Sequence, residues 1–207
     1  MLDTTLITLF IPTFFLVSIT PGMCMTLAMS LGISVGIRRT LWMMWGEVLG
    51  VSSVAIASVI GVSTMMLKVP NLFVVLKIIG ALYLLYIGIN MCLSKGKLAV
   101  STTIAQQNHV SRLHLFNQGF LTAIANPKGW AFMISLLPPF INPDYALPLQ
   151  LTVLVIIIII SEFICMMIYA AGGKTIAKKL IEKDNVKMLN RMSGCLMILV
   201  AIWLAIS

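Results

Sequence analysis

Charged and helix-breaking residues interrupt the apolar stretches of this sequence at seven positions. They are Pro21, Gly22, Glu47, Asn126, Pro127, Lys128 and Glu162. A charge inside a membrane helix is costly, so the two acids and the lysine are candidates for a functional site. Glu162, near the middle of its stretch, can carry a proton, with Glu47 second. Lys128 can fix a helix break by pairing with freed backbone carbonyls, or it can bind a substrate carboxylate. A fixed ion pair of Glu162 with Lys128 or Lys77 is the structural alternative.

The pairs Pro21-Gly22 and Asn126-Pro127 predict breaks in two apolar helices. Proline removes a backbone N–H and disturbs the carbonyl four residues earlier, and glycine adopts angles that other residues resist. Backbone groups freed in this way are tolerated in a membrane only against protein or a watery cavity. We therefore expect both breaks to face one cavity, where helix N-termini favour a carboxylate and C-termini an ammonium. A kink that only shapes packing is the alternative.

Met23, Cys24 and Met25 directly follow the first break and offer sulfur ligands that suit Cu(I). Successive helical residues point about 100° apart, so the three converge only if the backbone unwinds. No second cluster of soft ligands follows the other break. Export of a soft metal through Met23, Cys24 and Met25 is thus kept only as the alternative function. We expect no resident metal and no cofactor.

The composition indicates a membrane protein. Of the 207 residues, 60% are hydrophobic and 10% charged, whereas soluble domains carry about a quarter charged residues. A spanning helix needs about 20 apolar residues, and apolar runs are visible at 6–30, 41–66, 70–93, 116–141, 147–173 and 188–206. The first run lacks the basic flank of a secretory signal, so we expect it to be retained. The predicted fold is an all-α integral membrane protein with six transmembrane helices in one domain.

Basic residues are distributed unevenly between the connections. Eleven of the fourteen fall in the first, third and fifth connections: Arg38, Arg39, Lys95, Lys97, Arg112, Lys174, Lys178, Lys179, Lys183, Lys187 and Arg191. Because positive loops stay in the cytoplasm, we expect these connections to be cytoplasmic and both termini periplasmic. Topology then explains the net charge of +8 without nucleic-acid binding.

The two halves of the sequence share the order of their features. Each has a proline break followed by an intramembrane glutamate, Glu47 or Glu162. With three spans in each half, the halves would be inverted relative to each other, as is typical of secondary transporters. We expect repeat one at 1–93, a cytoplasmic loop at 94–115 and repeat two at 116–207.

An enzyme is not expected. Gly32-Ile-Ser34-Val-Gly36 matches the G-x-S-x-G pattern, which needs a strand–turn–helix context and a downstream acid followed by a histidine. His109 and His114 are the only histidines, and they precede Asp144 in a predicted loop. The four cysteines have no CxxC spacing, which argues against a zinc site or a disulfide framework.

With these motifs in place, the chain resembles the LysE/RhtB family of amino-acid exporters over nearly its full length. The resemblance rests on the Pro21-Gly22 break, on KIIGALYLLYIG at 77–88, and on Gly119-Phe120, Asn126-Pro127-Lys128 and Pro138-Pro139-Phe140. It implies six spans in a bacterial inner membrane and export of amino acids or related zwitterions, driven by the proton gradient.

The sequence departs from the family pattern in two places. The family commonly has Pro-Gly-Pro-Asn at the first break, where Met23 and Cys24 follow Gly22 here. It often has an acid at the position of Val51, and Glu47, one turn earlier on the same helix face, can replace it. An apolar break favours a substrate side chain less polar than that of homoserine or lysine.

We therefore predict an exporter of amino acids or small zwitterions that works by proton antiport. Its predicted site residues are Pro21, Gly22, Glu47, Asn126, Pro127, Lys128 and Glu162. Lys77, Tyr83, Tyr86 and Asn90 are secondary candidates. The expected partners are the substrate, protons and membrane lipid. The small-residue face from Gly46 to Gly50 also permits a homodimer.

Overall fold

The computed structural model describes residues 3–68, 70–93, 110–142, 144–173 and 183–206, and every regular element in these ranges is helical. The helices are α1 (Thr4–Ser18), α2 (Met23–Ser34), α3 (Ile37–Lys68), α4 (Pro70–Leu93), α5 (Arg112–Ile124), α6 (Pro127–Leu136), α7 (Leu147–Ala171) and α9 (Lys183–Ile206), with a short 3-10 turn, η1 (Pro138–Phe140). Helices occupy all six predicted apolar runs, so the prediction of an all-helical fold is confirmed.

Both predicted helix breaks are present. α1 ends at Ser18 and α2 begins at Met23, and the two helices meet at a bend of 58°. Ala125 and Asn126 separate α5 from α6. Two helical segments among the described residues, Ile37–Gly61 and Leu147–Ala171, are long and apolar enough to cross a membrane alone, and the bent α1–α2 pair passes as a third.

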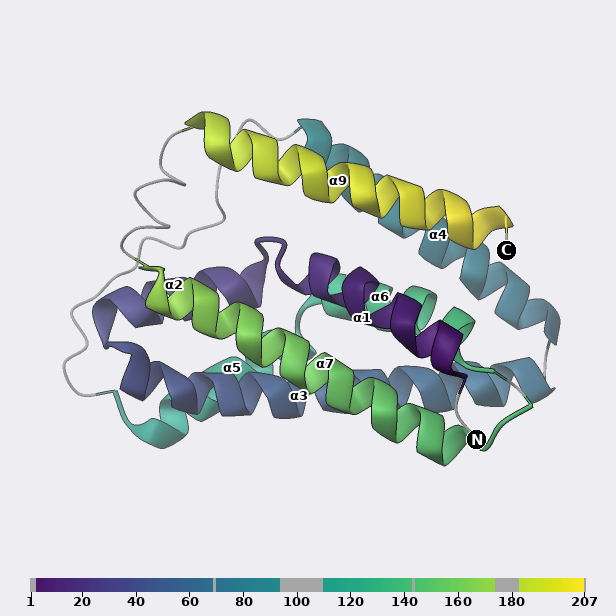
Figure 1. The fold of residues 1–207 in the computed structure, drawn as a ribbon, viewed down its shortest axis with the longest axis horizontal. Coiled ribbons are helices and arrows are strands. Elements are labelled where there is room, and N and C mark those ends of the chain that lie inside the picture. The colour runs from purple at the N-terminus through teal and green to yellow at the C-terminus, as the bar shows by residue number, and fades with distance from the viewer. Residues whose placement is uncertain (1–2, 69, 94–109, 143, 174–182, 207) are drawn as a thin grey trace.

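The helices pack mainly across the two halves of the chain. α3 lies along α5, α2 packs against α7, and α4 pairs with α9. Figure 1 shows α4 and α9 side by side, with the other helices forming the larger body of the molecule. Both chain ends lie at the same end of the molecule in this view. The helix breaks lie within the larger body.

Glycines bring α3 and α5 into backbone contact. A Cβ added to Gly46 would lie 1.9 Å from the Phe116 carbonyl oxygen, and one added to Gly119 would lie 2.0 Å from the Met43 carbonyl oxygen. A Cβ on Gly50 would lie 2.7 Å from the Ala123 Cβ. The prediction that the face from Gly46 to Gly50 permits a homodimer is therefore wrong, because α5 of the same chain covers this face.

Two of the predicted connections are shorter than expected. Gly36, with a φ of +81°, ends the first connection, and its carbonyl accepts a hydrogen bond from Thr40 Oγ1 at 2.9 Å. Arg38 and Arg39 therefore lie in the first turn of α3. In the third connection, Ser111 caps α5, so helix begins inside the predicted loop 94–115. Residues 94–109 and 174–182 of the predicted basic loops lie outside the described residues.

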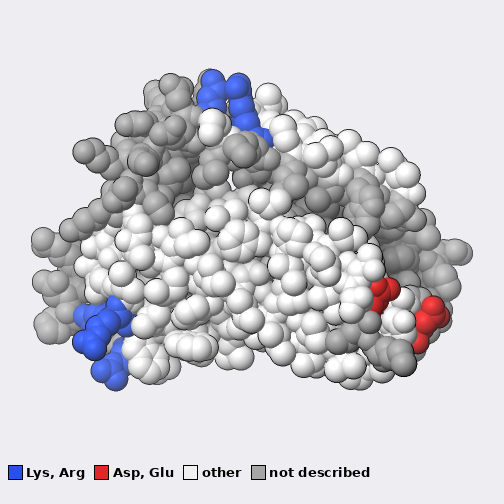
Figure 2. All heavy atoms as spheres, in the orientation of Figure 1, with Lys and Arg blue, Asp and Glu red and all other residues white. Residues whose placement is uncertain are grey.

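Surface charge separates the two ends of the molecule. Figure 2 shows the drawn acids at one end of the molecule, one group of basic side chains at the opposite end, and a second basic group on the upper edge near the middle. Arg38 and Arg112 lie at the starts of α3 and α5, and Arg191 lies in the first half of α9, whereas Asp3 caps α1 and Asp144 precedes α7. The Asn142 amide donates to Asp3 Oδ2 at 3.0 Å and lowers the pKa of this carboxyl.

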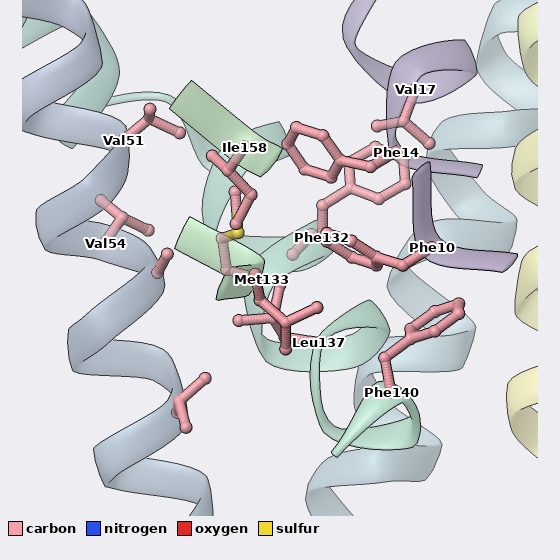
Figure 3. Close-up of a cluster of buried hydrophobic side chains, with 14 of the residues drawn as sticks. Phe10, Phe14, Val17, Val51, Val54, Phe132, Met133, Leu137, Phe140 and Ile158 are labelled. Carbon is pink, nitrogen blue, oxygen red and sulfur yellow. The ribbon is translucent and has the colours of Figure 1, made fainter. Parts of the chain in front are cut away.

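Two buried clusters with different side chains surround the helix breaks. The first, shown in Figure 3, contains aromatic and branched side chains, among them Phe10, Phe14, Phe132 and Phe140. The second is rich in methionine: Met25, Met29, Met43, Met44 and Met166. Methionine is more adaptable than rigid aromatic rings in a packed core. The second cluster is therefore the softer of the two.

Candidate functional site

A small cavity lies between the two breaks, with a volume of about 50 Å³. Its polar lining includes Ser18, Thr20, Glu47, Asn126, Lys128 and Glu162. Its apolar lining includes Phe14, Val51, Val54, Ala123, Phe132 and Met133. Gly22 also lines it, while Pro21 and Pro127 are chain neighbours of lining residues. The structure thus brings the charged site candidates of α3, α6 and α7 together at one place.

Residues from the second half of the chain bind the carbonyls freed at the first break. Lys128 Nζ donates to the Val17 and Thr20 carbonyl oxygens, at 3.4 and 3.5 Å, and also to Thr20 Oγ1. The Tyr169 hydroxyl donates to the Ile19 carbonyl at 2.9 Å. An ammonium has three protons, so all three have an acceptor here. Lys128 therefore fixes the first break.

The second break supplies its own partners. The Asn126 side chain accepts from the Lys128 backbone N–H at 3.2 Å and so caps α6. Trp130 Nε1, one turn into the same helix, donates to the Ile124 carbonyl at 2.8 Å. Pro127 fits the first turn of α6, where its missing N–H would have had no intrahelical partner. The second break is thus satisfied locally.

The two acids of the cavity differ in how their oxygens are bonded. Glu162 Oε1 accepts from Ser18 Oγ at 3.0 Å. Glu47 is only 2% exposed, and its Oε2 has no hydrogen-bond partner. Cys24 and Glu47 both line the cavity. No ion pair joins either acid to Lys128 within the described side chains, so the predicted pairing of Glu162 with Lys128 is not seen.

The secondary candidates on α4 lie elsewhere. Tyr83 and Tyr86 are exposed, at 38% and 63%, and stack against each other. The Asn90 amide donates to the Tyr86 carbonyl one turn back. None of the three lines the cavity. The Lys77 side chain lies outside the described residues.

Sequence reasoning missed three residues that the structure brings to the breaks: Ser18, Thr20 and Tyr169. Ser18 and Thr20 flank the first break directly, so their position was a usable signal. Tyr169 follows Glu162 by seven residues, which places both on one face of α7. Nothing in the sequence indicated that this face meets the first break.

The sulfur residues after the first break do not form a metal site. Cys24 and Met25 are buried and line the cavity, whereas Met23 is 47% exposed. The Asn126 amide lies 3.8 Å from the Cys24 sulfur. No group of three His, Cys, Asp or Glu side chains within the described part of the chain could hold a metal ion. The alternative of a soft-metal exporter is not supported.

Comparison with known proteins identifies the family. A family model described as LysE type translocator matches residues 14–207. The chain belongs to this family. It is a membrane protein of a family of translocators, which are not enzymes.

Related proteins agree with this assignment. The chain is 28% identical over 190 residues to the homoserine/homoserine lactone efflux protein of Salmonella typhimurium, a match that covers 92% of this chain and 91% of the relative. An uncharacterized membrane protein of Vibrio cholerae is 27% identical over 177 residues, which cover 86% and 85% of the two chains. One from Pseudomonas aeruginosa is 32% identical over 130 residues, covering 61% and 58%. No solved structure matches the chain.

Proposed function

We propose that this protein exports amino acids or closely related zwitterions in exchange for protons. The observation that carries the proposal is the cavity between the two helix breaks, which is lined by Lys128, Glu47 and Glu162. One cation and two acids in an otherwise apolar body suit a molecule that carries both charges. The name of the Salmonella relative, an efflux protein for homoserine, supports the same class of substrate.

The substrate carboxylate would bind at the start of α2. Gly22 begins this helix without a side-chain cap, and the N–H groups of a first helical turn favour an anion. Cys24 and Met25, in that turn, line the cavity. The start of α6 is already capped by Asn126, so it is the less suitable of the two helix ends.

Glu162 would carry the proton, with Glu47 as the second candidate. Antiport requires a group that changes its charge between the loaded and the unloaded carrier, and a carboxyl beside the substrate meets this requirement. Ser18 Oγ, which is 3.0 Å from Glu162 Oε1, belongs to the last turn of α1. Protonation of Glu162 would therefore change a contact at the first break.

A six-span arrangement of two inverted repeats would place this cavity within the bilayer. The broken pairs α1–α2 and α5–α6, the long helices α3 and α7, and the final helices α4 and α9 occur in the same order in each half. α3 of the first half packs on α5 of the second half, and α7 of the second half packs on α2 of the first. The charge separation in Figure 2 agrees with a cytoplasmic basic end and periplasmic termini.

The cavity is too small for the whole substrate in this conformation. A cavity of about 150 Å³ holds a molecule the size of benzene, and this one has about 50 Å³. Binding therefore requires the helices around the cavity to separate. The methionine-rich cluster around Met43 and Met166 offers the softer packing for such a movement.

Transport by the purified protein in lipid vesicles tests the proposal. We expect labelled amino acids of one class to move against an imposed proton gradient, to reverse direction with the gradient, and to stop when a protonophore removes it. Glu162→Gln should retain exchange of substrate for substrate and lose the response to the gradient. Asn90→Ala, on the exposed face of α4, is the matched control and should behave as the wild type.

Transport that is independent of the proton gradient would contradict antiport while leaving the exporter in place. Failure to move any amino acid, by protein that is folded and inserted, would contradict the proposed function as a whole.

A further inference from the structure

One carboxyl oxygen of Glu47 is a hydrogen-bond acceptor without a partner in the cavity. Among the polar groups of the cavity, Lys128 is occupied by the first break and Glu162 Oε1 by Ser18. Glu47 Oε2 is buried and has no partner. A buried carboxylate oxygen without a hydrogen bond is costly. A ligand that donates a hydrogen bond to this oxygen would remove that cost.

An apolar wall continues from Glu47 along α3. Val51 and Val54 follow at one and two helical turns and line the same cavity. Figure 3 shows both valines directed from α3 towards Met133 and the buried aromatic residues. The cavity lining also contributes the apolar side chains of Phe14, Phe132 and Met133. A hydroxyl placed against this wall would lose its hydrogen bonds to water without replacement.

We propose that Glu47 binds the substrate's ammonium group and that the substrate's side chain lies along Val51 and Val54, so that the protein prefers amino acids with an apolar side chain. This inference rests on the proposed function and names its substrate class. The carboxylate would then lie at the start of α2, where Cys24 lines the same cavity as Glu47. The preference differs from the homoserine named for the Salmonella relative.

Exchange across vesicle membranes tests the preference without mutation. Vesicles that contain the purified protein are loaded with unlabelled amino acid, and uptake of labelled leucine or labelled homoserine is measured. Competitors are leucine, methionine, homoserine, and 4-methylpentanoate, which is leucine without its amino group. We expect leucine and methionine to compete better than homoserine by about tenfold, the effect of one buried polar group. We expect 4-methylpentanoate to compete at least tenfold less well than leucine.

Glu47→Gln tests the role of the carboxylate. The concentration of leucine for half-maximal exchange should rise by about 10- to 100-fold, as expected when a hydrogen bond to a charged group is lost. The gap between leucine and 4-methylpentanoate should narrow at the same time, which a purely structural role would not produce. Ser58→Ala is the matched control, because Ser58 Oγ is another buried, unpartnered group of α3 that lies outside the cavity lining.

Other outcomes would contradict the side-chain preference, the binding of the ammonium group or the proposed function itself. Stronger competition by homoserine than by leucine would contradict the apolar side chain while leaving amino-acid export intact. Equal competition by 4-methylpentanoate and leucine would contradict the binding of the ammonium group, even if Glu47→Gln fails to fold. Absence of exchange for every amino acid contradicts the proposed function itself.

Discussion

The two helix breaks look alike in the sequence but are stabilised differently. At the second break, Asn126 and Trp130 bind backbone groups of their own segment. At the first break, Thr20 binds the Val17 carbonyl locally. The carbonyls of Ile19 and Thr20, and a further bond to Val17, are supplied with donors by Lys128 of α6 and Tyr169 of α7, both more than a hundred residues away. One break is therefore satisfied within its own half of the chain, and the other depends on the opposite half.

This difference indicates how movement can be coupled to substrate binding. A locally capped break keeps its shape when neighbouring helices shift. The first break keeps its shape only while α6 and α7 stay close, because its partners belong to them. A shift of either helix would release carbonyls into the cavity. We expect the first break to govern transport and the second to govern local stability.

Of the substitutions at the two breaks, Lys128→Met should have the largest effect on stability and transport. It removes the Lys128 ammonium from the Val17 and Thr20 carbonyls, of which Val17 keeps only its bonds from Thr20, and it leaves two acids without a nearby cation. We expect a loss of about 2–3 kcal/mol in the free energy of unfolding and loss of transport, measured by thermal unfolding in detergent and by vesicle uptake. Lys128→Arg retains the charge and should unfold at a higher temperature than Lys128→Met. A loss no greater than that of Asn126→Ala would contradict the dependence of the first break on the other half.

Tyr169→Phe should have the second-largest effect. It removes one hydrogen bond to the Ile19 carbonyl, and a membrane-buried hydrogen bond contributes about 0.6 and at most about 1.7 kcal/mol. We expect a small fall in the unfolding temperature together with a clear change in the transport rate. Trp130→Phe, which removes the matching bond at the second break, should cost similar stability and leave transport nearly unchanged. Equal effects of the two variants on transport would remove the distinction between the breaks.

Asn126→Ala should mainly reduce stability. The loss of a helix cap costs about 1 kcal/mol, and the change does not touch the contacts of Lys128 Nζ. Thermal unfolding should show this loss, and Asn126→Ser, which retains a capping oxygen, should restore most of it. A loss of transport with unchanged stability would instead assign Asn126 to substrate binding.

Gly22→Ala should have the smallest effect. The φ of Gly22 is −144°, which any residue adopts, and an added Cβ would lie 3.7 Å from Lys128 Cδ and Nζ, an ordinary contact. We expect a change in stability within about 0.5 kcal/mol and normal transport in the same assays. A severe defect would show that the first break needs glycine during its movement, although the described conformation does not.

Much of the fold followed from local features of the sequence. The apolar runs predicted the helices of the described residues, because an apolar helix is recognised by length and hydrophobicity. Pro21 and Pro127 predicted both breaks, because proline acts on its own turn of backbone. The ends of connections were predicted less well, since Gly36 and Ser111 allow α3 and α5 to start earlier than their apolar residues do.

The amino-acid order is enough to find the groups that could serve a charged ligand: two acids, a lysine and two breaks in apolar helices. The partners of these groups depend on how the helices pack. The tertiary structure assigned Lys128 to the first break and Glu162 to Ser18, and it left Glu47 Oε2 unpartnered against an apolar wall. The physical reason is that backbone breaks act within a few residues, whereas hydrogen bonds across the cavity join residues more than a hundred positions apart. Those pairings depend on which helix faces meet, which the close α3–α5 contact through Gly46 and Gly119 helps to set.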